Sequence, residues 1–461
     1  MSNDRELYEL LTEYGKSDYY PFHMPGHKRN KEFLKIAQTD ITEVEGFDDL
    51  HSPHGILRGY MERAAKVFGA QETYFLVNGS TGGLLAGIGA ATKGAGKVVM
   101  ARGCHRSVYN AVIINKLTPV YIYPEIDQRY GFYKGVTAAQ VRAVLDENDE
   151  GDVSAVAITS PTYDGIVSDV KGIAEVCHER DIPLIVDEAH GAHFAFSNEF
   201  PVSAVKYADI VVNSTHKTLN SLTQTALLHA RGKLIDRKFL HYALTCYQSS
   251  SPSYILMASL DSCVRFAARS KARFTEFALK AAEIRKRINN NCKHLYIVDN
   301  DDVSRFVIAD REGRSVGTYV YRRLYEDYHL QLEMFMPFYA TAILTVFDTD
   351  EGLKRLEDAV CELDKRIESE GLSEMEPVKY FPKRTSPGII MTPYEAGVKP
   401  WHYVPLEESE GLVAADYIYL YPPGSPIIVP GERMDSWTME RLRRFLENGF
   451  SPRGIKDGKI R

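Results

Sequence analysis

The chain has 461 residues, 44% of them hydrophobic and 25% charged, which is typical of a globular protein with a sizeable core. The formal net charge is −7, and the lysines and arginines are scattered, which argues against nucleic acid or an anionic membrane as a main partner. The polar start MSNDRELYELLTEYGK and the lack of a long apolar run predict a cytosolic protein without a membrane span. Six dispersed cysteines without a CxxC pair predict reduced thiols rather than disulfides or a zinc site.

From about residue 70 to 230, short apolar runs alternate with helical stretches, the pattern of an α/β domain with a mostly parallel sheet. After an N-terminal segment (1–20), we expect this large domain to occupy residues 21–285. The expected strands, in chain order, are ETYFLV (72–77), KVVMA (97–101), VSAVAIT (153–159), IPLIVD (182–187) and ADIVVN (208–213). Ligands bind outside the carboxyl ends of strands in such sheets, so the polar segments after these runs should form a site.

The second half of the chain predicts two further domains. A charged stretch after residue 265, with apolar positions at helical spacing, indicates a helix that leads away from the large domain. Strand-like runs within 295–310 and 330–347, followed by an amphipathic pattern over 352–367, predict a smaller α+β domain at 286–370. Prolines and glycines in 371–461 predict a C-terminal domain of loops and a short strand.

The tetrad STHK (214–217) follows one expected strand, and Asp187 ends another. Pyridoxal phosphate needs an amine to hold its aldehyde as a Schiff base and an anion beside its ring nitrogen, and Lys217 and Asp187 would fill these roles. A Schiff-base lysine needs a depressed pKa, which burial and nearby positive charge supply. The alternative is a solvated lysine after a strand. Ser214 could donate to the phosphate, and His216 could orient the lysine or the phosphate.

A glycine-rich segment, NGSTGG (78–83), lies between an expected strand and a stretch of small residues. Backbone amides at a helix N-terminus, with the hydroxyls of Ser80 and Thr81, make an anion site suited to the cofactor phosphate. A plain glycine-rich turn gives the same pattern.

Three histidines also follow expected strands. The imidazole of His105, after KVVMA, could stack on the pyridine ring, although a structural histidine would fit the same place. His190 and His193, in HGAH, could suggest a metal pair, but no third ligand at metal spacing is visible, and no metal is predicted.

An ordered set of motifs resembles the Orn/Lys/Arg decarboxylases, in the shorter form that lacks an N-terminal wing domain. The motifs are PFHMPGHK (21–28), DITEVEGFDDLHSPHGI (40–56), NGSTGG (78–83), GCHRSVYNA (103–111), SPTYDG (160–165), VDEAHGAHF (186–194), STHKTLNSLTQTALLH (214–229), QSSSPSYILMASLD (248–261) and YPPGSPIIVPGE (421–432). They span nearly the whole chain, and the likeness is weakest from about 286 to 400. The chain departs from the family pattern at TLNSLTQ, where a proline often follows the leucine, and at Phe47, where leucine is commoner.

The resemblance implies a fold-type-I, aminotransferase-like architecture and a homodimer or higher assembly with active sites at the subunit interface. It gives Lys217, Asp187 and His105 the roles of Schiff-base lysine, pyridinium partner and stacking residue. The expected cofactor contacts are Ser80, Thr81, Gly82, His105, Asp187, His190, Ser214, His216, Lys217, Ser250 and Ser251, with the last two reaching the neighbouring subunit's phosphate.

For the substrate, the resemblance places Glu432 near a distal cation, and Asp48 and Asp49 are further candidates. Helix capping or loop hydrogen bonding would explain these two aspartates equally well. The implied reaction is pyridoxal-phosphate-dependent α-decarboxylation of a basic L-amino acid, which releases carbon dioxide and an amine that is a precursor of polyamines. Family likeness favours arginine over lysine or ornithine. The depth of the cavity would distinguish the three substrates, and the sequence does not determine that depth.

Two alternatives remain open. Transamination or β-elimination on the same cofactor expects an arginine of the smaller domain to clamp the α-carboxylate, and the sequence assigns none. A silent family member that binds the cofactor as a regulator is the other, and the intact set of Lys217, Asp187 and His105 speaks against it.

Overall fold

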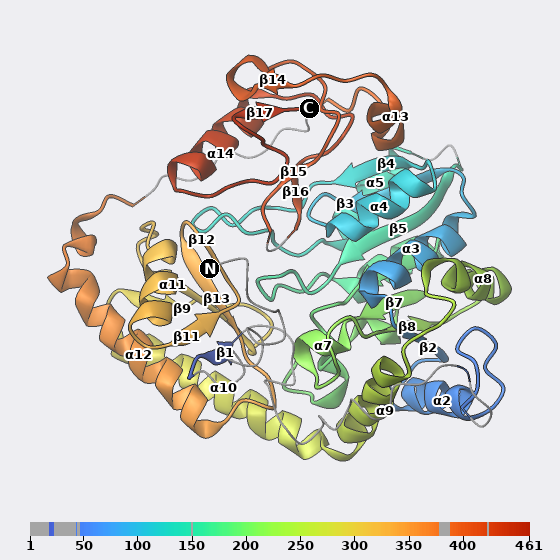
Figure 1. Cartoon of the computed structure of the whole chain (residues 1–461), viewed down its shortest axis with the longest axis horizontal. Helices are drawn as coiled ribbons and strands as arrows, with labels where there is room; N and C mark the ends of the chain where they lie inside the picture. The colour runs from blue at the N-terminus through green and yellow to red at the C-terminus, as the bar shows by residue number, and fades with distance from the viewer. Residues whose placement is uncertain (1–17, 23–42, 44–46, 149–150, 378–387, 422–423) are drawn as a thin grey trace, which may run out of the picture.

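The computed structural model describes residues 18–22, 43, 47–148, 151–377, 388–421 and 424–461. Figure 1 shows a large sheet with its helices, a smaller sheet beside two long helices, and a C-terminal segment that lies over both. The predicted α/β architecture with a mostly parallel central sheet is confirmed. No helix within these ranges is long and apolar enough to cross a membrane.

The large sheet has seven strands. In spatial order they are β2 (Glu72–Leu76), β8 (Ala226–Ala230), β7 (Ile210–Asn213), β6 (Leu184–Asp187), β5 (Val153–Thr159), β3 (Lys97–Ala101) and β4 (Thr118–Ile122). β3 to β7 pair in parallel, and β8 is antiparallel to both of its neighbours. The central strands are buried throughout, which explains why they appear in the sequence as unbroken apolar runs.

Helices cover this sheet in contacting groups. They are α2 (Ile56–Phe68), α3 (Gly79–Thr92), α4 (Arg106–Ile114), α5 (Ala138–Asp146), α6 (Val170–His178) and α8 (Arg237–Tyr247). α3 packs against both α4 and α8, whereas α5 packs against α6. Glycines let α3 approach the strands closely, because a Cβ atom on Gly83 would lie 2.5 Å from Leu76 Cδ1.

The smaller sheet is antiparallel, in the order β12 (Met334–Met336), β13 (Tyr339–Ile343), β10 (Arg305–Asp310) and β9 (Leu295–Ile297). α9 (Tyr254–Arg269) and α10 (Lys271–Asn291) lead to it, and α11 (Gly317–Glu326) and α12 (Asp350–Ser369) pack beside it. β1 (Tyr20–Phe22) pairs in parallel with β11 (Leu330–Leu332). Residues 21 and 22, which we expected at the start of the large domain, therefore contact the smaller one.

The C-terminal segment holds more regular structure than the single short strand we predicted. Its elements are α13 (Pro393–Val398), β14 (Val404–Pro405), β15 (Ile418–Tyr419), β16 (Pro426–Ile428), α14 (Ser436–Glu447) and β17 (Lys459–Ile460). α14 begins where the Asp435 side chain accepts a hydrogen bond from the Thr438 N–H, and it buries Met439, Leu442 and Phe445. Because prolines and glycines are frequent earlier in the segment, the sequence predicts loops, and the amphipathic pattern of α14 was missed.

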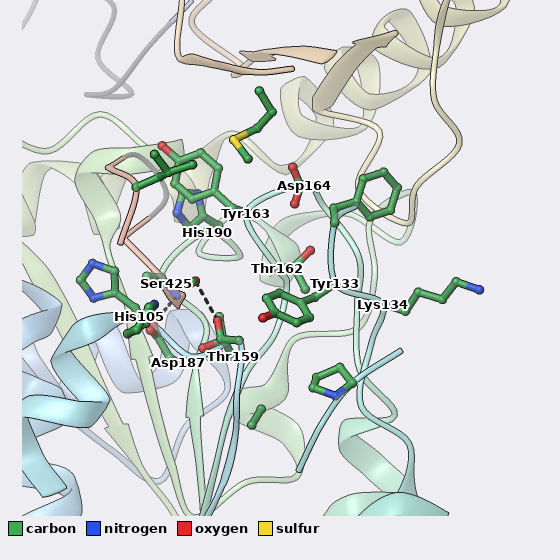
Figure 2. A pocket seen from close by; sticks show the side chains of 18 of the residues that line it. His105, Tyr133, Lys134, Thr159, Thr162, Tyr163, Asp164, Asp187, His190 and Ser425 are labelled. Atoms are coloured by element: carbon green, nitrogen blue, oxygen red, sulfur yellow. Dashed lines mark hydrogen bonds between the residues drawn. The ribbon is translucent and has the colours of Figure 1, made fainter. Parts of the chain in front are cut away.

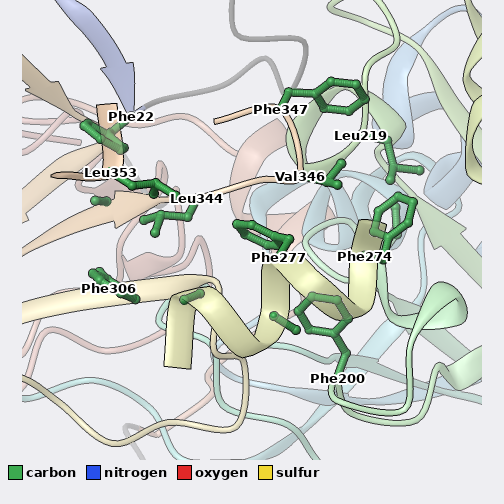
Figure 3. Packing of buried hydrophobic residues seen from close by; sticks show 14 of the residues in the cluster. Phe22, Phe200, Leu219, Phe274, Phe277, Phe306, Leu344, Val346, Phe347 and Leu353 are labelled. Carbon is green, nitrogen blue, oxygen red and sulfur yellow. The ribbon is translucent and has the colours of Figure 1, made fainter. Parts of the chain in front are cut away.

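An aromatic core joins the two larger sheets. Figure 3 shows Phe200 and Leu219 of the large domain beside Phe274 and Phe277 of α10, with Phe306 of β10 in the same cluster. Each fully buried side chain of this size stabilises the fold by about 1.5–3 kcal/mol. The cluster therefore fixes β10 against the loops that follow β6 and β7.

Candidate active site

The carboxyl ends of four neighbouring strands bring three predicted residues together with Thr159, which the sequence did not indicate. His105 follows β3, Thr159 ends β5, Asp187 ends β6 and Lys217 follows β7 within α7 (Thr215–Thr218). All four line one cavity of about 230 Å³, and Figure 2 shows His105, Thr159 and Asp187 around it. The prediction that these strand-end loops converge is confirmed.

Lys217 and Asp187 lie in a poorly solvated part of the cavity. Burial lowers the pKa of Lys217, as does Arg305, whereas Asp187 and Glu333 act in the opposite direction. Burial raises the pKa of Asp187, opposed by Lys217 and by the Ala189 N–H, which donates to Oδ1 over 3.2 Å. A buried carboxylate needs a cation beside it.

His190 connects the lysine to the smaller domain. Its Nε2 lies 3.0 Å from Lys217 Nζ, and its Nδ1 lies 2.9 Å from Nη2 of Arg305. Tyr163 packs on the imidazole with ring centroids 4.6 Å apart (Figure 2). Burial lowers the pKa of His190 far below its ordinary value, and Lys217 and Arg305 add to this effect. The imidazole is therefore neutral.

His105 is held by the start of α4. The Ser107 N–H donates to His105 Nδ1 over 3.2 Å, and Ser107 Oγ lies 2.8 Å from the same atom. Burial, together with Lys217 and Arg106, lowers the pKa of His105 to about 4. A Cβ atom on Gly424 would lie 3.2 Å from the ring, and Gly424 has a φ of 87°. Only glycine fits that position without strain.

The predicted phosphate contacts gather where α3 and α7 begin. Ser80 Oγ lies 2.8 Å from Ser214 Oγ, and His216 Nδ1 donates to the Thr225 carbonyl over 2.7 Å. Ser80 and His216 line the cavity, whereas Thr81 is exposed in this chain. A Cβ atom on Gly82 would lie 3.3 Å from the Tyr247 carbonyl, so this glycine serves close packing. First-turn N–H groups of a helix lack intrahelical acceptors, which suits α3 to an anion.

These residues fit pyridoxal phosphate. Asp187 is a buried carboxylate that lacks a full set of partners, and the Thr159 hydroxyl beside it is buried without a hydrogen-bond partner in the described part of the chain. A protonated ring nitrogen at this depth would suit the carboxylate. Lys217 would hold the aldehyde, and Ser80, Ser214 and His216 would face the phosphate.

Comparison with known proteins identifies the family of this chain. The family model for the Orn/Lys/Arg decarboxylase major domain matches residues 6–313, and the model for the C-terminal domain of the same family matches residues 381–449. The chain belongs to this family. It is 30% identical to an arginine decarboxylase of Halalkalibacterium halodurans, over 99% of this chain and 96% of that protein. An arginine decarboxylase of Bacillus subtilis is 29% identical, over 99% of this chain and 97% of that protein.

Solved structures show the same fold. Lysine decarboxylase A from Pseudomonas aeruginosa has a TM-score of 0.76 at 19% identity, and the match covers 90% of this chain and 72% of that one. An SPT structure with PLP has a TM-score of 0.54 at 13% identity, covering 67% of this chain and 77% of that one. The fold is therefore fold-type I, as predicted.

Glu432 does not take the place that the decarboxylase resemblance gave it. Its carboxylate accepts hydrogen bonds from Arg102 Nε at 3.0 Å and Nη2 at 2.8 Å, and from the Val429 N–H at 2.9 Å. Arg102 is 0% exposed, Glu432 is 1% exposed, and Glu432 is not among the residues that line the cavity. The prediction of a substrate contact is corrected to a buried ion pair between β3 and the C-terminal segment.

Asp48 and Asp49 also lie outside the cavity of their own chain. Asp48 accepts hydrogen bonds from the N–H groups of His54, Gly55 and Leu57, and Asp49 accepts one from His51. The loop hydrogen bonding that we considered for both aspartates is what the structure shows. Their role toward a substrate, like the reach of this loop to another subunit, stays a prediction.

Ser250 and Ser251 are exposed at the start of the segment that leads into α9. They belong to the same surface as the Asp48 loop, because His51 Nε2 lies 2.7 Å from the Ser249 carbonyl. Within one chain neither serine lines the cavity. Contact with a neighbouring subunit's phosphate remains a prediction.

The two histidines of HGAH serve different sites. His193 Nε2 lies 3.2 Å from Asp302 Oδ1, and its ring packs on Phe194 and Phe200, whereas His190 faces Lys217. Within the described ranges, no group of three or more His, Cys, Asp or Glu side chains has an arrangement that could hold a metal ion.

Sequence reasoning missed several polar residues of the site. Tyr163, Asp164, Glu333 and Arg441 line the cavity, and Arg305 lies behind His190. Tyr163 donates from its hydroxyl to Glu333, which follows β11. Arginine at the head of a buried strand was a visible signal for Arg305. Glu333 and Arg441 carried none, since only the packing of the domains places them here.

Proposed function

We propose that this protein is a pyridoxal-phosphate-dependent decarboxylase of a basic L-amino acid, with arginine as the preferred substrate. The observation that carries the proposal is the convergence of Lys217, Asp187 and His105 on one cavity of a fold-type-I chain in the Orn/Lys/Arg decarboxylase family. Relatives that match nearly the full chain are named arginine decarboxylases, whereas an Escherichia coli lysine decarboxylase matches 55% of it.

The cofactor, when bound, would supply an electron-withdrawing ring that accepts the electron pair left as carbon dioxide departs. Asp187 would keep a proton on the ring nitrogen. His105, neutral and wedged between α4 and Gly424, would fix the tilt of the ring. Ser80, Ser214 and His216 would bind the phosphate, with the backbone N–H of Thr81 in the first turn of α3.

The cavity wall opposite these residues carries both signs of charge. Glu333 and Asp164 supply carboxyl groups, and Arg441 supplies a guanidinium. Burial raises the pKa of Asp164 to about 6, and its Oδ1 is buried without a hydrogen-bond partner in the described ranges. The distal cation of a basic amino acid can bind the carboxyl groups of this wall. Glu333 and Asp164 therefore replace Glu432 as substrate candidates.

The aromatic side chains of the cavity favour loss of the carboxylate. Tyr133, Phe132 and Tyr163 line it beside Met336. A carboxylate held against such poorly hydrated groups loses solvation, which favours its departure as neutral carbon dioxide. Arg305, the arginine of the smaller domain nearest Lys217, lies behind His190 and does not line the cavity. Arg305 therefore does not supply the arginine clamp that transamination expects, whereas Arg441, which lines the cavity, belongs to the C-terminal segment.

The experiment is a substrate panel. The purified protein is incubated with pyridoxal phosphate and with arginine, lysine or ornithine, and carbon dioxide and amine are measured. Arginine should give the highest kcat/KM. Absence of product from all three substrates, in a protein that shows the visible absorbance of lysine-bound pyridoxal phosphate, would exclude the decarboxylase.

The cofactor assignment has its own control. Replacing Lys217 with alanine should abolish the visible absorbance, because no other lysine is placed to condense with the aldehyde in the described cavity. Lys134 also lines the cavity, but it is half-exposed at 50% and ion-paired with Glu125, so Lys134→Ala should keep the absorbance. A band that survives in Lys217→Ala and disappears in Lys134→Ala would reverse the assignment.

The Asp48 loop and the Ser250–Ser251 segment are the surface that we propose to meet a second copy of the chain. Both are outside the cavity of their own chain, and they contact each other through His51 and Ser249. Sedimentation of the purified protein would test this. A monomer that retains full activity would exclude a composite site.

A further inference from the structure

A buried arginine from the smaller domain reaches the catalytic lysine through a histidine. Arg305 begins β10 and is 0% exposed. Its Nη2 lies 2.9 Å from His190 Nδ1, and His190 Nε2 lies 3.0 Å from Lys217 Nζ. The three side chains thus form one hydrogen-bonded chain that ends at Lys217.

The direction of each hydrogen bond follows from the chemistry of the groups. A guanidinium stays protonated in proteins and only donates, so His190 Nδ1 must accept. A neutral imidazole carries one proton, which then lies on Nε2 and points at Lys217. An ammonium has three donors and no lone pair, so Nζ can accept this hydrogen bond only as the neutral amine.

We propose that Arg305 is a positioning residue of this site: by donating to Nδ1 it selects the Nε2–H tautomer of His190, which holds Lys217 as an unprotonated amine. The amine lone pair is what attacks an aldehyde carbon, so the device keeps the nucleophile ready. The identity of that aldehyde rests on the proposed function, whereas the protonation state of Lys217 does not.

Other charged groups act on Lys217 from the surrounding elements. Asp187 at the end of β6 and Glu333 after β11 favour the ammonium, whereas burial and Arg305 favour the amine. His105, whose pKa is about 4, is neutral near pH 7, and His216 turns its Nδ1 to the Thr225 carbonyl. Because Asp187 and Glu333 favour the ammonium, the neutral amine of Lys217 depends on burial and on the Arg305–His190 contact.

Competitive labelling of the cofactor-free protein measures the protonation state of Lys217 directly. A trace of acetic anhydride is added at a series of pH values, and acylation of the Lys217 peptide is quantified by mass spectrometry. Exposed Lys365 serves as the reference lysine in the same chain. Lys217 should be acylated with a midpoint well below that of Lys365.

Arg305→Met removes both the charge and the donor, and should raise the Lys217 midpoint by about one pH unit, a tenfold loss of labelling below the midpoint. Arg305→Lys retains a donor and a cation and should restore part of the shift. Arg285→Met is the matched control. Arg285 is 8% exposed and donates to Asn300 Oδ1 and the Arg305 carbonyl, but it does not contact His190.

A second variant separates the hydrogen bond from the electric field. His190→Phe keeps Arg305 but breaks the chain, and it should also raise the midpoint. An unchanged midpoint in His190→Phe would overturn the relay even if Arg305→Met shifts it, because Arg305 would then act through its charge alone. Equal shifts in Arg305→Met and Arg285→Met would overturn it too.

The labelling uses neither cofactor nor substrate, so its outcome is independent of the proposed reaction. If Arg305→Met does not fold, His190→Phe still decides the question. A wild-type protein with a lowered Lys217 midpoint but no decarboxylation would keep the relay and exclude the decarboxylase.

Discussion

Replacing Glu432 with glutamine distinguishes a buried ion pair from a substrate contact. Glu432 and Arg102 are paired by two hydrogen bonds inside the protein, with neither side chain exposed by more than 1%. Arg102 also donates to the Tyr109 hydroxyl at 3.1 Å and to the Pro426 carbonyl at 2.8 Å. Although burial opposes it, Glu432 raises the pKa of Arg102 further above its ordinary value. The pair therefore joins β3 to the C-terminal segment.

The expected loss of stability is large. Removing one partner of a buried ion pair costs about 3–5 kcal/mol, because the other charge is left buried without compensation. At roughly 2.1 cal/mol/K per residue, the entropy of unfolding of 461 residues is about 1 kcal/mol/K. Glu432→Gln and Arg102→Met should each lower the melting temperature by about 3–5 °C.

A double-mutant cycle completes the assay. Calorimetry of Arg102→Met, Glu432→Leu and the double variant should give a double loss smaller than the sum of the single losses by about 2 kcal/mol or more, since an apolar pair leaves no stranded charge. KM for arginine should change little in any variant that stays folded. An unchanged melting temperature in Glu432→Gln, together with a raised KM for cationic substrates only, would refute this reasoning and return Glu432 to the substrate.

Three further outcomes follow from the geometry. Asp187→Asn should lower kcat on the order of a hundredfold with a small change in melting temperature, because it removes the anion that we propose to lie beside the ring nitrogen; full activity would contradict that role. Gly424→Ala should lower kcat and cofactor affinity, because φ at Gly424 is 87° and the new Cβ atom would lie 3.2 Å from the His105 ring. Gly449→Ala is the control: Gly449 is exposed, has a φ of 77° and has open space around it, so this variant should lose stability alone. Burial lowers the pKa of His229 to about 3. As the pH falls below 6.5, His229 therefore takes up a proton in the unfolded chain but stays neutral in the folded chain. The stability of the folded chain, which is full above pH 6.5, decreases as a result. Between pH 7 and pH 5, the free energy of unfolding measured in urea should fall by about 2 kcal/mol more in the wild type than in His229→Gln. An equal fall in both proteins would exclude His229 as the source.

The core of the site could be predicted because one physical rule places it. Buried parallel strands appear as unbroken apolar runs, and their carboxyl ends meet at one edge, so His105, Asp187 and Lys217 could be brought together without knowledge of the helices. This prediction required only that each loop directly follow its strand, and it did not require the conformation of the loop. Glycines of NGSTGG could likewise be assigned to a helix start by their position after β2.

Residues that meet across domains followed no such rule. The Arg102–Glu432 pair spans 330 positions, and the sequence indicated a role for Glu432 but none for Arg102. Arg305 depends on the aromatic core that presses β10 against the loop after β6, and Glu333 depends on the turn between β11 and β12. A pattern within one element cannot specify such contacts, because they are set by how two domains pack.

This division has a consequence for the chemistry. The predicted residues around Lys217 follow strands of the large sheet and would hold the cofactor, whereas Arg305, Glu333 and Arg441, which sequence reasoning missed, come from the smaller and C-terminal domains. Related chains could therefore keep the first set and change substrate through the second. Exchange of Glu333 for glutamine tests this separation, because it should weaken a cationic substrate while the affinity for pyridoxal phosphate stays within about threefold of the wild-type value, a difference below about 1 kcal/mol. Equal losses for cofactor and substrate would show that the two sets act as one unit.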